Sequence, residues 1–316
     1  MTRRRHGGWA PHVVFELAWA GPRLTLGVWV PGGVPAFQVK RIAETSWPGA
    51  VAEIRAAGPP VLAGPVMAEG GEVAPAGGRD WLPLRAGERA DPLTGVYAHG
   101  LYLGAHNAAV VQVAARPAGA SRLARARAGA QGRGAATAGG ALAGAGRALV
   151  RFVLDLVTEL MRLGPSSAPR GHSPYGPPAA ERRDPIWQAQ SRAAVRKLTD
   201  VPLWEVAVRY AAATTLSGEP ARNRVRGQAI ALSSAFGAFS GDVELADRPL
   251  RHPADAVAQR GLRRGFVAST PELAALAHPP YAVATVAGLR RATARPVPPP
   301  PGVRRLPAMG GGADEW

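Results

Sequence analysis

The chain has 316 residues and a formal net charge of +16, and all but two of its 38 basic residues are arginines. It contains no cysteine, which excludes disulfides, thiolate metal sites and cysteine nucleophiles. It has no run of about 18 apolar residues and no apolar secretion leader, so we expect a cytoplasmic chain without a membrane-spanning helix.

Residues 10–116 are expected to form one mixed α+β unit. Two β-branched and aromatic runs, 13–19 and 24–30, flank an Ala-Gly-Pro turn and predict a hairpin. A helix is expected over 34–47, because its apolar residues fall on one helical face. The residues of that face are Val34, Phe37, Ile42 and Ala43.

The same unit continues with two short strands, a helix and a closing strand. The two strands are expected at 61–67 and 80–84, joined by a glycine-rich loop. Asp91 followed by Pro92 is typical of a helix start, and the valine-rich run 109–115 predicts the last strand. The glycines of the loop are Gly70, Gly71, Gly77 and Gly78.

Residues 117–183 differ in composition and predict a connector. Its first part is rich in Gly, Ala and Arg and its last part is rich in proline, which indicates a linker. Ser121 is a candidate cap for a short arginine-rich helix, and 149–163 predicts an amphipathic helix. That helix is expected to pack on its own domain, with a partner helix or a membrane surface as alternatives.

Residues 184–294 are expected to form a second α+β unit. It opens with a helix from Asp184 to Lys197 and a half-buried strand over 203–212, which alternates apolar and polar residues. A long helix over 220–239 is expected to bury one apolar face. The residues of that face are Val225, Ile230, Leu232 and Phe236.

The second unit is expected to end with short elements. Strands are predicted at 243–245 and 265–268 with a basic loop between them, followed by a helix over 270–277 and a last strand at 281–286. The proline-rich residues 295–316 are expected to form a tail.

One order of elements, strand-helix-strand-strand-helix-strand, is therefore expected twice. It predicts an α+β fold of two ferredoxin-like, split βαβ units, 10–116 and 184–294. The connector 117–183 joins them, and residues 1–9 form a basic N-terminal tail.

No familiar catalytic or cofactor motif is found. A phosphate-binding loop needs G-x-x-x-x-G-K-[ST], and neither Lys40 nor Lys197 follows a glycine in that frame. The seven histidines lack metal-ligand spacing, no G-x-S-x-G elbow occurs, and no two carboxylates are recognisably placed for acid–base work. We predict no catalytic residue, no cofactor and no metal, and we identify no small-molecule substrate.

The arginines at the start of the connector are the candidate nucleic-acid-binding residues. Guanidinium groups tethered among Gly and Ala would bind phosphates without distinguishing bases. The alternative interpretation is a solvated basic surface, to which the codon usage of a GC-rich genome contributes. The candidates are Arg122, Arg125, Arg127 and Arg133.

Several stretches together resemble the region that precedes the motor domain in actinobacterial conjugative-transfer and type IV secretion ATPases of the FtsK/HerA class, some of which are labelled type VI secretion proteins. The resemblance covers roughly residues 10–300. The stretches are Val-Trp-Val-Pro-Gly-Gly-Val-Pro at 28–35, Ser-Trp-Pro-Gly-Ala at 46–50, Val-Val-Gln-Val-Ala-Ala-Arg-Pro at 110–117, Lys-Leu-Thr-Asp at 197–200 with the strand 205–210, Arg-Arg-Gly-Phe at 263–266 and Pro-Glu-Leu-Ala-Ala-Leu-Ala-His at 271–278.

In that family a motor with a Walker A loop would follow the segment 294–298, and this chain carries no such loop. The resemblance therefore implies a non-catalytic accessory or assembly module of a DNA-translocation or secretion system, and no family catalytic residue is carried over. The expected partner is a P-loop translocation ATPase or the chain's own oligomer, with DNA reached through the basic connector and contact with the inner face of the cell membrane as a further possibility. The alternatives are an autonomous, non-sequence-specific nucleic-acid-binding protein and an enzyme with an unrecognised site.

Overall fold

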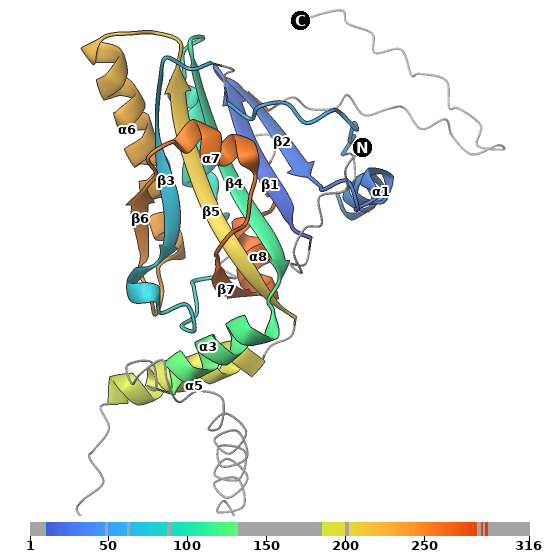
Figure 1. Cartoon of the computed structure of the whole chain (residues 1–316), viewed down its shortest axis with the longest axis vertical. Coiled ribbons are helices and arrows are strands. Elements are labelled where there is room, and N and C mark those ends of the chain that lie inside the picture. Colours follow the sequence, from blue (N-terminus) through green and yellow to red (C-terminus); the bar gives the residue numbers. More distant parts are fainter. Residues whose placement is uncertain are drawn as a thin grey trace, which may run out of the picture.

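The computed structural model describes residues 11–47, 50–61, 64–86, 90–131, 185–199, 202–282, 286, 288 and 289 (Figure 1). The strands are β1 Val13–Ala20, β2 Arg23–Trp29, β3 Met67–Pro75, β4 Asn107–Pro117, β5 Leu203–Thr214, β6 Leu245–Pro249 and β7 Phe266–Ser269. The α-helices are α1 Ala36–Ser46, α2 Thr94–Tyr97, α3 Ala120–Ala130, α5 Pro185–Thr199, α6 Glu219–Ala235, α7 Pro253–Gln259 and α8 Thr270–Leu276. Short 3₁₀ turns are η1 Ala76–Gly78, η2 Ala98–Tyr102 and η3 Phe236–Phe239.

The described strands form a single antiparallel sheet in the order β2-β1-β4-β5-β3-β6, and β7 also pairs with β5. β5 lies between β4 on one side and both β3 and β7 on the other, β7 at residues 203–206 and β3 at residues 208–214. The α+β class is confirmed.

The two ferredoxin-like units are not confirmed, because strands from both halves of the sequence pair with one another. β4 pairs with β5 from Asn107↔Thr214 to Pro117↔Trp204, and β3 lies between β5 and β6. Every residue of β4 from 107 to 116 is buried, so this strand needs cover on both faces and neighbours on both edges. A half-buried strand was expected at 203–212, yet β5 is also buried on both faces, because it too has neighbouring strands on both edges and cover on both faces.

Most of the elements expected from local sequence patterns are confirmed. The first hairpin, the helix at α1, the strand at β4, the helix at α5 and the helix at α8 lie within a few residues of their predicted bounds. The arginine-rich helix α3 begins after Gly119, so Ser121 lies inside the helix and is not its cap.

The strands expected at 61–67 and 80–84 are wrong, and one strand, β3, runs through the supposed glycine loop instead. Gly70 and Gly71 lie within β3 because neighbouring groups approach too closely for a side chain. A Cβ at Gly70 would lie 2.8 Å from the Ala211 Cα, and one at Gly71 would lie 2.5 Å from an Asp247 carboxylate oxygen. These glycines therefore mark close packing rather than a turn.

The C-terminal part also differs from expectation. The supposed basic loop contains helix α7, and the strand expected at 243–245 is displaced to β6. At 281–286 the described residues 281, 282 and 286 are not in a strand. Ile230 lies on the exposed side of α6, not on its buried face.

One face of the sheet carries the main apolar core. Helix α6 packs on β3 and β5, and α8 packs on β5 and β7. The largest fully buried side chains of this core include Trp19, Leu232, Phe236, Phe239 and Leu276.

The opposite face carries a row of polar side chains that runs across four strands. In the pairing of neighbouring strands, Gln112 on β4 lies opposite Glu16 on β1 and opposite Arg209 on β5. Arg209 in turn lies opposite Glu72 on β3. Gln112 donates to Glu16 at 2.6 Å, and Arg209 pairs with Glu72 at 3.2 Å. Such a row is tolerated in the interior because its charged groups are paired.

Residues 260–265, here called the strap, cover this polar row. Arg260 pairs with Glu16 at 2.7 Å and takes a left-handed backbone conformation with φ of 49°. Arg209 donates to the Gly261 carbonyl, and Arg116, which pairs with Glu205, donates to the Leu262 carbonyl at 3.1 Å. The strap is therefore attached to the sheet through charge-assisted hydrogen bonds.

Several expectations lie outside the described residues: the amphipathic helix 149–163, the proline-rich part of the connector and both tails. Among the helices that are described, none has the length and apolarity needed to cross a bilayer.

Candidate functional site

Helices α3 and α5 lie side by side beyond one end of the sheet (Figure 1). They pack through a small apolar cluster that joins them to the start of β5 and to β7. Gly129 approaches the Trp81 ring so closely that no side chain fits there. The buried members of the cluster are Ala126, Leu198, Leu203 and Val267.

Neither helix contains an acidic residue, although together they carry several cations. On α3, Arg125 and Arg127 are exposed to solvent. On α5, Arg192 and Arg196 are exposed and lie one turn apart on the same side of the helix. These four arginines are here called the basic helix pair.

Arg122, which was predicted as a nucleic-acid-binding residue, makes polar contacts within the chain. It forms an ion pair with the buried Asp80 and donates to the Gly265 carbonyl at 3.1 Å. Burial, and next the neighbouring cation Arg125, lower the pKa of Arg122. Its guanidinium thus fixes α3 to the end of the strap.

The other candidates divide between those that are exposed and one that is not described. Arg125 and Arg127 are exposed to solvent, whereas Arg133 lies outside the described residues. Arg192 and Arg196 were not predicted as binding residues, because the helix expected at 184–197 was interpreted only as part of the second unit. Two arginines four residues apart in a helix without acidic residues could have indicated a basic surface at Arg192 and Arg196.

Lys197 is buried, unlike the neighbouring Arg196 on the same helix α5. Its ammonium lies 3.0 Å from the Glu272 carboxylate and donates to the Leu82 carbonyl at 2.9 Å. Burial lowers the pKa of Lys197, and the Glu272 carboxylate acts against that shift. Glu272 also accepts from the Leu84 and Ser269 amides at 2.6 and 2.7 Å, so this buried pair joins α5 to α8 and to residues 82–84.

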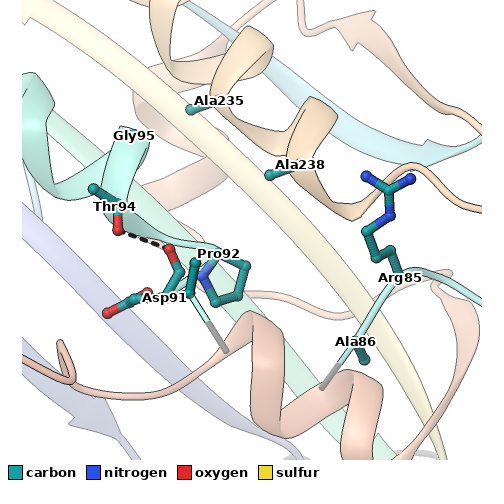
Figure 2. Close-up of a pocket in the computed structure, with 9 residues that line it drawn as sticks. Arg85, Ala86, Asp91, Pro92, Thr94, Gly95, Ala235 and Ala238 are labelled. Atoms are coloured by element: carbon teal, nitrogen blue, oxygen red, sulfur yellow. Dashed lines mark hydrogen bonds between the residues drawn. The ribbon is translucent and has the colours of Figure 1, made fainter. Parts of the chain in front are cut away.

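A cleft of about 240 Å³ lies between the start of α2 and the end of α6. Figure 2 shows that the Arg85 guanidinium and the Asp91 carboxylate stand at opposite ends of it and do not converge. The Asp91 carboxylate already accepts from the Leu93 and Tyr281 amides at 2.9 and 3.0 Å. The rest of the lining is mostly alanine, glycine and proline, whose short side chains leave the space open.

Charge therefore gathers at the basic helix pair rather than in the cleft. Among the described residues, no group of three or more His, Cys, Asp or Glu side chains is arranged to hold a metal ion. Exposed guanidinium groups on an acid-free surface attract phosphate esters through charge and bidentate hydrogen bonds. No protein-family model, curated protein or solved structure matches this chain.

Proposed function

We propose that this chain is a non-catalytic accessory or assembly module of a DNA-translocation or secretion system that contacts nucleic-acid phosphates through the basic helix pair. The observation that carries the proposal is the juxtaposition of two acid-free helices with Arg125, Arg127, Arg192 and Arg196 exposed. We propose a DNA-translocation or secretion system because residues 10–300 resemble the pre-motor region of conjugative-transfer ATPases.

The contrast with other cations of the chain supports this assignment. Arg116, Arg209 and Arg260 are each paired with a carboxylate on the polar row side of the sheet. A paired cation has already released its counterions and adds little to phosphate binding, whereas an unpaired surface arginine releases them when DNA binds. The exposed arginines of the basic helix pair are therefore better suited to a DNA backbone than the paired arginines of the polar row side.

Fluorescence anisotropy with a labelled DNA duplex over a salt series tests the proposal. Replacing the four arginines of the basic helix pair by alanine should reduce the slope of log K against log salt by about 3 to 4, because each phosphate contact contributes about 0.9. Arg122 is left intact, since removing it would leave Asp80 buried without its cation.

A matched variant controls for the change in net charge. Four other exposed arginines, Arg222, Arg224, Arg226 and Arg251, lie on α6 and just before α7. Their replacement by alanine lowers the net charge equally but should leave most of the slope in place. Equal losses in the two variants would show that the helix pair is not a specific interface.

The same surface also favours a second candidate function, an autonomous DNA-binding protein without sequence preference. Co-purification from the host separates the two: an accessory module should carry a P-loop ATPase with it, and the alanine variant of the helix pair should still do so. DNA binding without any such ATPase partner would favour the autonomous protein.

A further inference from the structure

Within the part of the chain that the structure describes, the outer edge of β2 is open for most of its length. Leu24 uses its outward amide to donate to the Gly288 carbonyl at 3.0 Å, and it forms an isolated parallel bridge with Leu289. Outward-facing residues alternate along an edge strand, so the amide and carbonyl of Leu26 and of Val28 face outward too. No described residue pairs with those four groups.

Apolar side chains on this edge and in the segment that follows β2 are exposed. Val28 is 42% exposed, and helix α1, which follows β2 after six residues, has no buried residue. Phe37 and Ile42 on that helix are 63% and 64% exposed, although the sequence predicted that they face a core. Trp47, Val51 and Ile54 are also exposed.

The opposite edge of the sheet is protected in the usual ways. β6 is short, carries Asp247 and Arg248, and ends in Pro249. Charged residues, short length and proline all discourage pairing at an edge. β2 has none of these devices between Thr25 and Trp29, which indicates an edge that accepts another strand.

The positive charge on β2 and α1 indicates the composition of a strand that could pair with this edge. Arg23 on β2 and Arg41 on α1 are exposed, and no described carboxylate pairs with them, whereas Lys40 pairs with Glu44 and Arg55 with Glu53. Successive side chains of a strand point to opposite faces, so Arg23 lies on the face away from Val28. A partner strand that alternates apolar and acidic residues would match both faces.

We propose that the β2 edge binds an extended polypeptide segment of alternating apolar and acidic residues as an added strand. A second copy of this chain fits less well, because it would bring its own Arg23 and Arg41 and a net charge of +16 to the contact. The edge and α1 lie away from the basic helix pair, so both surfaces can be occupied together (Figure 1).

The test uses the full chain and an eight-residue peptide that alternates valine and glutamate, followed by calorimetry and amide hydrogen exchange. Binding should slow exchange at Leu26 and Val28. A valine–lysine peptide should bind at least about fivefold more weakly, because it reverses the charge at the rim of the contact. The valine–glutamate peptide with a methylated backbone should lose about tenfold or more, because it cannot donate to the edge.

Two variants place the site on the protein. Val28→Pro removes an outward amide that the β1 ladder does not use, a position where an edge strand tolerates proline, and should lower affinity about tenfold. Charge reversal of Arg23 and Arg41 to Glu should abolish the preference for the acidic peptide, while reversal of Arg222 and Arg226 on α6 should not.

Three results would each overturn the proposal. They are equal binding of the acidic and basic peptides, undiminished binding of the methylated peptide, and a dimer of the chain that Val28→Pro dissociates in sedimentation. If Val28→Pro does not fold, the methylated peptide and the exchange of the wild-type chain still decide the question.

Discussion

The buried imidazole of His99 makes a specific prediction about stability and pH. His99 lies in η2, edge-on to Trp19 with ring centroids 5.8 Å apart, and its Nε2 has no described hydrogen-bond partner. Burial lowers the pKa of His99 from 6.5 to about 4. The folded chain therefore holds this ring neutral where the unfolded chain begins to protonate it.

The sign follows from the two pKa values. Between pH 6.5 and 4 the unfolded state binds more protons at His99 than the folded state does, so stability falls as the pH falls through this window. Integrated down to pH 4, the difference amounts to about 3 kcal/mol. Above pH 6.5 the contribution is constant.

Urea unfolding at a series of pH values, followed by tryptophan fluorescence, measures this effect. The His99→Leu variant removes the titrating group, so between pH 7.5 and 4 it should lose about 3 kcal/mol less stability than the wild type. His106→Leu, at an exposed histidine, serves as the matched control substitution. Parallel profiles for His99→Leu and the wild type would refute the reasoning.

Three further substitutions test the packing around the helix pair and the sheet. Lys197→Met should cost about 3–5 kcal/mol in urea unfolding because it leaves the buried Glu272 without its cation, and adding Glu272→Gln should recover a substantial part. If Lys197→Met alone costs nothing, the pair is not structural. Gly70→Ala should destabilise by more than about 2 kcal/mol, since the new Cβ meets the Tyr210 carbonyl, and an unchanged thermal midpoint would contradict this. Ser269→Ala removes a capping box and should cost about 1 kcal/mol, whereas Ser269→Asp should cost little.

Local signals were sufficient for the elements whose ends are marked by short-range chemistry. The Ala-Gly-Pro turn indicated the first hairpin, and Thr270, Pro271 and Glu272 indicated the start of α8. The cap of α8 is Ser269, one residue before Thr270. Asp91 accepts from the Leu93 amide, but α2 begins only at Thr94 with Leu93 as its N-cap residue, so Asp91 is not the helix cap that was expected. For the hairpin and for α8 the deciding contact lies within three residues in sequence.

Composition misled where it obscured such signals. The segment before β7 was expected to be a loop because it is rich in arginine, yet Pro253 and Asp255 mark the start of α7 in the ordinary way. The Gly-Gly pair at 70–71 suggested a turn, whereas it lies in a strand against which other groups pack closely. Amphipathic spacing in α1 indicated a buried face, but spacing does not show whether a partner is present in the same chain.

The pairing of β4 with β5 could not be predicted, because nothing short-range specifies which strand a two-sided apolar strand will meet. Valine and alanine make up most of β4 and half of β5, and they lie on both faces of each strand. Such strands favour the centre of a large sheet over the edge of a small unit. The repeated order of elements suggested two independent units, and it gave no information on pairing between them.

That pairing also explains why the basic helix pair exists. β4 and β5 are antiparallel with Pro117 opposite Trp204, so the chain leaves β4 and enters β5 at the same end of the sheet. The helix that follows β4 and the helix that precedes β5 must therefore emerge together. Because both are acid-free, the sheet register alone concentrates four exposed arginines on one end of the molecule. The basic surface thus depends on strand topology as much as on composition. A variant that disrupts the β4–β5 register should therefore lack the DNA binding that we propose, even with all four arginines present.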